Sequence, residues 1–263
     1  MVSSANDPAS GISFDVVSIR PVEERNNGRL TNPPDGDGID SDNGTLEDVI
    51  RWNFDLGNGW REDQFQGAPK GFRTDNYDIH AKVGDSQVAV WQKLDDAARR
   101  RVFRKVLFDR FHLACHFIYE KRPVYNLVIA KGGAKLHPST PEDLKPFEGK
   151  GYLLPEIFGV KIYTLGKLQF GFPEIPMELF ADNFLTRQSE RTVIDKTGLT
   201  GKYTFTLTFK GIYASAAADE DPSAPAVPSL FTALQEQIGL KLEPGEGAVP
   251  ILVFDRVEIP AAN

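Results

Sequence analysis

Cysteine is almost absent from this sequence: Cys115 is the single cysteine among 263 residues. One cysteine cannot form an intrachain disulfide, which excludes the small secreted domains that depend on a disulfide framework. The sequence also has no apolar run long enough to cross a membrane, no HExxH pair, no P-loop and no glycine-rich dinucleotide motif. We therefore predict a chain that does not span a membrane, and we predict neither a cofactor nor a metal.

Positive charge is in short supply as well. The chain has 30 Lys and Arg against 37 Asp and Glu, which gives a formal net charge of −7. A dedicated nucleic-acid binder normally carries a basic face, so nucleic acid is excluded as the expected partner. The basic run Arg99–Arg101, with Arg104 and Lys105 after it, lies among acidic residues of one expected helix. We interpret it as a solvated helix face.

Alternation of apolar and polar residues is the clearest pattern that is present. Between Lys202 and Lys210 the apolar residues occupy every second position and threonines lie between them, which predicts a strand with one buried face. Ser229 is placed to cap a helix that ends at Gly239, and its apolar face is Leu230, Ala233, Leu234 and Ile238. An apolar run from Val249 to Phe254 predicts a final, central strand.

The same order of elements recurs upstream. An alternating strand from Tyr77 to Val83 precedes a helix over 97–110, and strands over 113–119 and 123–129 follow it. Thr45 and Asp48 form a capping-box pattern, which predicts an earlier helix that begins after Thr45. A second predicted helix, over 177–185, is its counterpart in the second set. The offset between the two sets stays close to constant, at 126, 128 and 125 residues for the pairs Tyr77/Tyr203, Phe103/Phe231 and Val124/Val249.

These patterns predict an α+β fold with mixed or antiparallel sheets, built as two related helix-plus-sheet halves by internal duplication. The expected boundaries are 12–135 for the first repeat, 136–150 for a linker and 151–260 for the second repeat. A disordered insert is expected at 214–228, because that segment is low in complexity and rich in Ala, Asp and Pro. Chance alignment of two βαββ segments is the alternative to duplication.

The sequence closely resembles a soil-associated bacterial family of unknown function that is abundant in Acidobacteria. The resemblance covers Phe14 to Asn263, and the segments that carry it are FDVVSIRP, GTLEDVIRW, TDNYDIHAKV, VIDKTGLTGKYTFTL, PSLFTALQEQIGLKLE and PILVFDRVEIP. Members of that family typically look exported, so the resemblance implies an extracytoplasmic protein, periplasmic or secreted, whose signal peptide is not part of this sequence. Some relatives are fused to membrane-bound zinc-peptidase sensors, and the peptidase motif is lacking here. Pro176–Leu199 and Ser229–Phe254 also resemble the short N-terminal domains of secretins and TonB-dependent receptors, which is a likeness at the level of fold.

Cys115 is the first candidate for chemistry, because His112 and His116 lie beside it. On a strand, however, His116 points to the opposite face from Cys115, and we predict a small buried core thiol. On a strand, His112 and His116 would share a face but lie roughly 13 Å apart at about 3.3 Å per residue. A zinc site is therefore disfavoured, even if His80 on a neighbouring strand were a further ligand.

Asp35, Asp37, Asp40 and Asp42 are the best metal-like cluster, since carboxylates beside glycines suit calcium. Their spacing does not match an EF-hand, and a solvated acidic loop within an irregular stretch at 26–43 is the alternative. The sequence leaves calcium binding there open.

The remaining candidates form no catalytic set. The hydroxyl and carboxyl side chains lie outside any recognised motif, and the aromatic ones either line a groove for sugar or peptide or pack into the core. These residues are Ser139, Ser189, Ser229, Glu243, Glu246, Asp255, the turn Asp195–Thr197, and Trp52, Trp60 and Phe65.

We therefore expect an extracytoplasmic module that binds an unidentified protein, peptide or small molecule without turnover, with sensing at the cell envelope as one role. Addition of an extended peptide to a sheet edge is one mode, although Pro123 and Pro250 are expected to guard the edges. The alternative is a hydrolase of envelope or environmental polymers with an unrecognised site.

Overall fold

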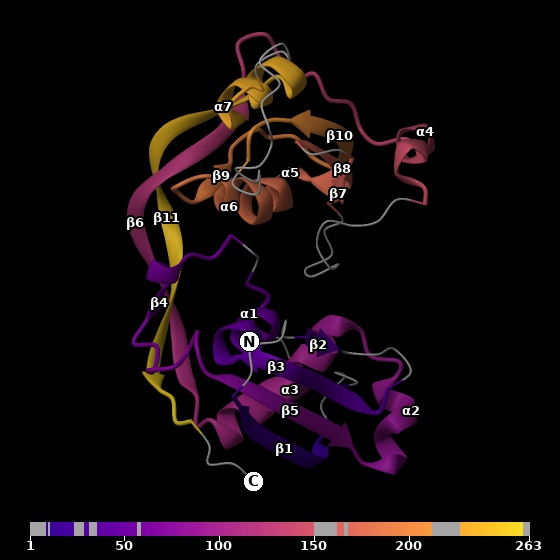
Figure 1. The fold of residues 1–263 in the computed structure, drawn as a ribbon, viewed down its shortest axis with the longest axis vertical. Helices are drawn as coiled ribbons and strands as arrows, with labels where there is room; N and C mark the ends of the chain where they lie inside the picture. The colour runs from indigo at the N-terminus through magenta and orange to yellow at the C-terminus, as the bar shows by residue number, and fades with distance from the viewer. Residues whose placement is uncertain are drawn as a thin grey trace. The chain divides into compact units, whose positions relative to one another are not determined.

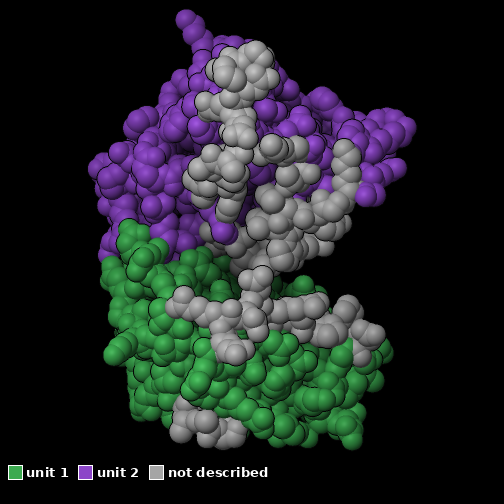
Figure 2. Space-filling view, in the orientation of Figure 1, with its two compact units in different colours: residues 1–56, 62–118, 250–263 green, residues 57–61, 119–249 purple. Residues whose placement is uncertain are grey.

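A computed structural model describes residues 9, 11–23, 29–31, 36–56, 59–149, 162–165, 168–211 and 227–259 (Figure 1). Helices and both antiparallel and parallel strand pairs are present, which confirms the α+β class. The chain divides into two compact units (Figure 2). Unit 1 comprises Met1–Leu56, Glu62–Ile118 and Pro250–Asn263, and unit 2 comprises Gly57–Arg61 and Tyr119–Val249.

An antiparallel sheet with the strand order β1-β5-β3-β2 forms the body of unit 1. The predicted inward residues of β5, from Tyr77 to Val83, are all buried. Part of the stretch predicted as a loop or irregular hairpin at 26–43 is the antiparallel pair β2–β3. The elements of this unit are β1 (Phe14–Val22), β2 (Arg29–Thr31), β3 (Gly38–Thr45), α1 (Leu46–Asn53), η1 (Glu62–Gln64), β4 (Phe65–Gln66), β5 (Asn76–Val83), η2 (Asp85–Gln87), α2 (Val88–Trp91) and α3 (Asp96–Arg110).

Helices α1 and α3 follow their sequence signals closely. The backbone N–H of Asp48 donates to Thr45 Oγ1 and the N–H of Thr45 donates to Asp48 Oδ2, which is the predicted capping box. The predicted inward face of α3 is buried. Arg99 is also buried and donates to the carbonyl oxygens of Trp91 and Gln92. The interpretation of its basic run as a solvated face is therefore wrong for Arg99, because its guanidinium finds backbone acceptors inside the unit.

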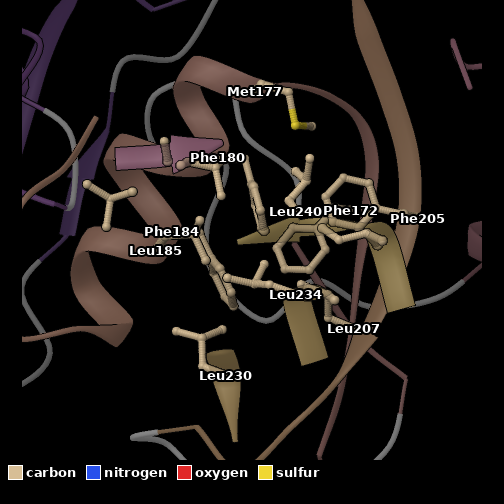
Figure 3. Close-up of a cluster of buried hydrophobic side chains, with 14 of the residues drawn as sticks. Phe172, Met177, Phe180, Phe184, Leu185, Phe205, Leu207, Leu230, Leu234 and Leu240 are labelled. Atoms are coloured by element: carbon tan, nitrogen blue, oxygen red, sulfur yellow. The ribbon is translucent and has the colours of Figure 1, made fainter. Parts of the chain in front are cut away.

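Unit 2 contains a smaller antiparallel sheet of order β10-β8-β7, covered by helical turns. Its core is a cluster rich in phenylalanine and leucine, which come from that sheet and from the helical turns that pack on it (Figure 3). The predicted helix at 177–185 and the strand at 202–210 supply the buried faces as expected. Its elements are α4 (Pro141–Leu144), η3 (Lys145–Phe147), β7 (Tyr163–Thr164), β8 (Gln169–Pro176), α5 (Met177–Leu179), η4 (Phe180–Leu185), α6 (Thr186–Gln188), β9 (Val193–Asp195), β10 (Lys202–Thr208), α7 (Leu230–Ala233) and η5 (Leu234–Ile238).

Two strands are much longer than the sequence predicts. The two strands expected at 113–119 and 123–129 are one strand, β6 (Ala114–Ile129), and the final strand expected at Val249–Phe254 is the end of a longer one, β11 (Leu240–Arg256). A third sheet has the order β4-β11-β6-β9. Pro123 and Pro250 lie within β6 and β11, just outside the residues that pair with β9 and β4, so their role in guarding sheet edges stays a prediction.

The turn-like composition of Pro244–Gly247 has a different physical reason. A Cβ on Gly247 would lie 2.3 Å from Ile194 Cδ1, and one on Gly245 would lie 2.4 Å from Asn126 Nδ2. These glycines permit close packing within unit 2 rather than a reversal of the chain.

The compact units differ from the sequential repeats at 12–135 and 151–260. Each long strand begins in one unit and ends in the other, because β6 passes from unit 1 to unit 2 at Ile118–Tyr119 and β11 passes back at Val249–Pro250. The linker at 136–150 contains α4 and η3. The insert at 214–228 lies outside the described residues except for its last two. Internal duplication stays a prediction.

Candidate functional site

A pocket of about 470 Å³ lies in unit 1, on the segment that links η1 and β4 to β5. Its volume is in the range of small-molecule sites, and we call it the 62–74 pocket. The lining residues are Glu62, Phe65, Gly67, Ala68, Pro69, Gly71, Phe72, Arg73 and Thr74.

Two glycines in the left-handed region shape the loop that forms this pocket. Gly67 has φ +72° and Gly71 has φ +83°, conformations that disfavour a side chain. A Cβ on Gly71 would lie 2.0 Å from Asp75 Oδ2, and the backbone N–H of Asp75 donates to the Gly71 carbonyl oxygen over 2.9 Å. The loop is therefore a tight, internally bonded turn.

Aromatic rings form the apolar base of the pocket. The centroid of the Phe72 ring lies 5.3 Å from that of Phe65 and 5.3 Å from that of Phe254, and all three residues are buried. Such edge and tilted contacts between aromatic rings add to the free energy gained by burial. The pocket thus rests on core residues, which keep its wall in place.

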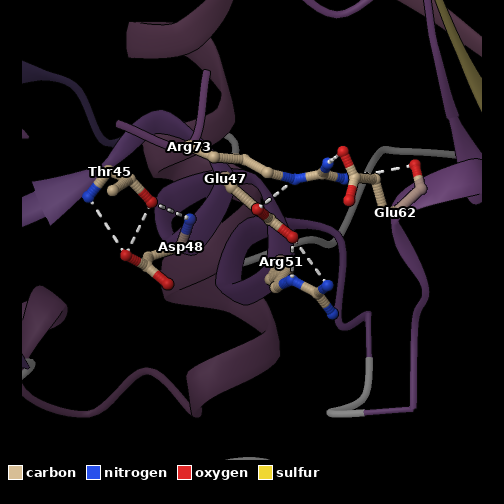
Figure 4. A network of polar contacts seen from close by, with 6 residues as sticks. All are labelled: Thr45, Glu47, Asp48, Arg51, Glu62 and Arg73. Carbon is tan, nitrogen blue, oxygen red and sulfur yellow. Dashed lines mark hydrogen bonds and ion pairs between the residues drawn. The ribbon is translucent and has the colours of Figure 1, made fainter. Parts of the chain in front are cut away.

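A network of four charged side chains adjoins the aromatic base (Figure 4). Glu47 of α1 accepts from Arg51 at 2.6 Å through Oε1 and from Arg73 at 2.7 Å through Oε2. Arg73 also forms an ion pair with Glu62 and donates to its backbone oxygen. The guanidinium carbons of Arg51 and Arg73 lie 5.2 and 5.8 Å from the Phe65 ring centroid. Two positive and two negative charges balance, so the network has no net charge.

The two carboxylates of this network differ in their exposure to solvent. The Glu62 side chain is 87% exposed, whereas that of Glu47 is 14% exposed and that of Arg73 is 28% exposed. Glu47 therefore holds the arginines in place, and Glu62 and one edge of Arg73 face the solvent beside the pocket. Together they present hydrogen-bond acceptors and donors next to an apolar surface.

The structure does not give Cys115 a catalytic setting. Burial raises the pKa of its thiol, against the opposing effect of the Arg104 charge. Nδ1 of His116 lies 2.8 Å from Asp255 Oδ2, and Nδ1 of His112 lies 3.1 Å from Glu258 Oε2. Cys115 is half-buried rather than fully buried.

Two large apolar residues of the strand predicted at 113–119, two and four positions after Cys115, are exposed. Phe117 and Tyr119 are 42% and 71% exposed. The alternation of burial breaks at His116 and Phe117, which are both exposed, and Ile118 rather than Phe117 is partly covered.

The described carboxylates of the acidic cluster, Asp37 just before β3 and Asp40 and Asp42 within it, are paired with basic side chains. Asp40 Oδ1 lies 2.8 Å from His80 Nδ1, Asp42 Oδ1 lies 3.9 Å from His80 Nε2, and Asp37 Oδ2 lies 3.1 Å from Lys82 Nζ. Asp35 lies outside the described residues. Within the part of the chain that the structure describes, no three His, Cys, Asp or Glu residues are grouped so that they could hold a metal ion.

The candidate serines take part in local hydrogen bonds. Ser229 Oγ accepts from the N–H of Thr232 as the predicted N-cap, and Ser139 Oγ lies 2.6 Å from Thr204 Oγ1. Ser189 Oγ donates to the Leu185 carbonyl oxygen. In the turn after β9, Asp195 Oδ1 accepts from the N–H and the hydroxyl of Thr197. These contacts stabilise caps and turns.

The candidate carboxylates and aromatics are divided between the two units. Glu243 pairs with Lys241 and Glu246 with Lys121. Trp52 packs on Phe103 in unit 1, whereas Trp60 is buried in unit 2. Among the three predicted aromatics, Phe65 lines the pocket.

The edge of β10 is one place where an extended peptide could add as a strand, and side chains cover part of it. The N–H of Ser139 donates to the Lys202 carbonyl oxygen over 2.9 Å. The amide of Gln237 bonds to both the N–H and the carbonyl oxygen of Thr208, at 2.9 and 2.8 Å. A side-chain amide thus satisfies the groups that a neighbouring strand would use, which disfavours peptide addition there.

Residues 47–257 match the model of a family described as a protein of unknown function, DUF3738. The chain belongs to this family. The DUF3738 match begins at Glu47, the carboxylate that binds both arginines of the network, and it includes all of the 62–74 pocket. No curated protein and no solved structure matches the chain. None of the helices in the described part of this DUF3738 protein has the length and apolarity that a membrane span requires.

Sequence reasoning did not find the charged network. Glu47 and Arg51 are four residues apart on a helix, which is a spacing that pairs charges. Arg73 lies 26 positions beyond Glu47 and reaches it through the fold of the loop. The pair at i and i+4 was the one local signal for this site.

Proposed function

We propose that this DUF3738 protein is a non-catalytic binding module and that the 62–74 pocket holds its ligand. The solvent-facing pair of Glu62 and Arg73 above the aromatic base is the observation that carries the proposal. The lining residues contain no histidine, cysteine or serine, and the Thr74 hydroxyl donates to Asp75 Oδ1 over 3.1 Å. These side chains are suited to holding a ligand by contact and hydrogen bonding.

The balance of charge favours an uncharged ligand. Arg73 is already shared between Glu47 and Glu62, so a bound anion would have to displace an existing carboxylate. A bound cation would meet Arg73 beside Glu62 and would lose hydration without a free counter-charge. The exposed carboxylate of Glu62 and the N–H groups of Arg73 suit a hydroxyl-bearing or amide-bearing ligand with one apolar face, such as a neutral sugar or a peptide with blocked ends.

We further propose that the protein acts outside the cytoplasm. The support is the sequence resemblance to a family whose members look exported. Cell fractionation of the native host tests this location independently of ligand binding, and recovery of the protein in the cytoplasmic fraction alone would contradict it.

Calorimetric screening of the purified protein against neutral oligosaccharides and end-blocked peptides tests the ligand proposal. Glu62→Gln should weaken binding of a hit by about 10-fold or more, because a hydrogen bond to a charged group contributes roughly 1.5–3 kcal/mol. Glu246→Gln, which replaces an exposed glutamate paired with Lys121 in unit 2, is the matched control and should leave binding unchanged.

The same screen discriminates binding from the hydrolase alternative. Retention of full affinity by Glu62→Gln would remove the pocket from the proposal. Multiple turnover of a glycoside, ester or peptide substrate, abolished by one carboxylate or hydroxyl substitution, would replace the binding module by an enzyme.

A further inference from the structure

The two short parallel strands are paired crosswise. β4, from the first half of the chain, pairs with the end of β11, with Phe65 opposite Leu252. β9, from the second half, pairs with the end of β6, with Val193 opposite Tyr125. In the sheet order β4-β11-β6-β9, each outer strand is short and each inner strand is long, so the arrangement is the same from either edge of the sheet. Each half therefore supplies a long strand to the short strand of the other half.

One side-chain and three backbone hydrogen bonds extend this crosswise pairing. In unit 1, Gln64 Nε2 donates to the Pro250 carbonyl oxygen over 3.0 Å, and the N–H of Glu258 donates to the Phe111 carbonyl oxygen over 2.7 Å. In unit 2, the N–H of Tyr125 donates to the carbonyl oxygen of Thr192, and Lys196 N–H donates to that of Leu127, both over 2.9 Å. The exchanged strand ends are thus bound along their backbones.

Burial shows that the exchanged ends are core residues. Leu252 of β11, which belongs to unit 1, is 0% exposed, and the ring of Phe254 packs on that of Phe72. Leu127 of β6 is 0% exposed and belongs to the apolar cluster of unit 2 together with Val193. Because burial of apolar side chains is the main source of stability, each unit lacks part of its core without the other half.

We propose that the two halves of the chain, up to Gly149 and after it, are an intramolecular strand-exchanged pair in which each half is the other's obligatory binding partner. The recognised feature is the end of a long strand, residues 250–256 or 123–129, and the receptor is the short strand and apolar core of the opposite half. This inference goes beyond ligand binding at the 62–74 pocket and does not depend on it.

A cut in the full chain tests the proposal. Gly149 is exposed, has φ +70° and has open space around its Cα, so a specific protease site can be inserted after it. After cleavage the two pieces should elute together as one folded species. The melting temperature of the cut protein should depend on protein concentration, whereas that of the uncut chain should not. Separation of the pieces in native buffer, with a cooperative melting transition for each, would overturn the proposal.

A matched pair of substitutions in the uncut chain gives a second test. Leu127 and Leu252 are equally buried, but Leu127 belongs to the first half and Leu252 to the second. Cys115 lies in unit 1 and reports on its opening through the rate of thiol labelling. Leu252→Ala should accelerate the labelling more than Leu127→Ala does, because Leu252 lies in the unit that contains Cys115. A larger effect of Leu127→Ala would contradict the exchange, because a unit 1 built from the first half alone would not depend on Leu252.

Discussion

The ring of Phe172 stacks on the ring of Phe205, with the centroids 5.1 Å apart and the planes 28° apart. Phe172 lies on β8 and Phe205 on β10, and the ring of Phe180 meets Phe205 edge-on at 5.0 Å. The contact joins the sheet of unit 2 to the helical segment that covers it. All three rings belong to the cluster in Figure 3.

Phe205→Ala should therefore destabilise the protein by about 3–5 kcal/mol, because a buried ring is lost and its neighbours cannot fully close the cavity. Thr206→Ala, at the adjacent exposed position of the same strand, is the control and should change the free energy of unfolding by no more than about 0.5 kcal/mol. Urea denaturation measures both. A loss below about 1 kcal/mol for Phe205→Ala would show that the ring is not part of a fixed core.

The two carboxylates on Arg73 should differ in their importance for folding. Glu47→Ala removes partly buried hydrogen bonds to two arginines and should cost about 1.5–3 kcal/mol. Glu62→Ala removes an ion pair of a largely exposed carboxylate and should cost about 0–1 kcal/mol. Denaturation midpoints in low salt measure both values, and equal losses would mean that the network does not hold the loop.

The ionised carboxylate of Asp182 should lower the free energy of unfolding at neutral pH, compared with an uncharged side chain at this position. Burial raises the pKa of its carboxyl group, and the nearby Glu178 charge raises it further. A raised pKa in the folded state contributes stability that is fully present below the unfolded pKa and lost as the pH rises through the folded pKa. Asp182→Asn should consequently raise Tm at pH 7, by about 2–4 °C for each 1 kcal/mol gained in the free energy of unfolding. The substitution should have little effect on Tm below about pH 3.9.

Asp143→Asn provides the control of opposite sign. Hydrogen bonds from the side chain and backbone N–H of Thr140 hold the pKa of Asp143 below its usual value. Its contribution is present above the unfolded pKa and is lost as the pH falls through the folded pKa. The Asp143→Asn variant should therefore be less stable than the wild type at neutral pH and equal to it in acid. Thermal melts between about pH 3 and 7 decide both cases, and parallel curves for Asp182→Asn and the wild type would contradict the prediction.

Cys115→Ala should leave ligand binding intact, because the residue lies outside the 62–74 pocket and its neighbouring histidines are paired with carboxylates. Burial raises the pKa of the thiol, so the thiolate fraction at neutral pH is low and labelling of the native protein should be slower than that of a free thiol. Labelling as fast as that of a model thiol, accompanied by loss of binding, would contradict this.

Local signals predicted the parts of the fold that local physics determines. The cap at Thr45, the cap at Ser229 and the left-handed Gly239 all appear in the structure, because each depends on hydrogen bonds or backbone angles within a few residues. The alternation in β5 and β10 likewise placed their buried faces.

The long strands and the candidate site depended on contacts that no local pattern encodes. Gly245 and Gly247 look like turn residues and are strand residues, because their partners Asn126 and Ile194 approach from the distant strands β6 and β9. Arg73 reaches Glu47 through the closure of a loop, so its role could not be inferred from the neighbouring residues.

The crosswise pairing also determines when the protein becomes complete during synthesis. Phe65 is made early, but its strand partner Leu252 is made only after the sheet of unit 2 has been translated. The apolar sheet face and the β4 edge of unit 1 therefore stay open until the end of β11 has been translated, whereas Tyr125 is already present when Val193 is made. A chain released before residue 250 would lack the strand that completes unit 1, which is the portion translated first. Quality-control factors would then encounter unit 1 with part of its apolar core exposed.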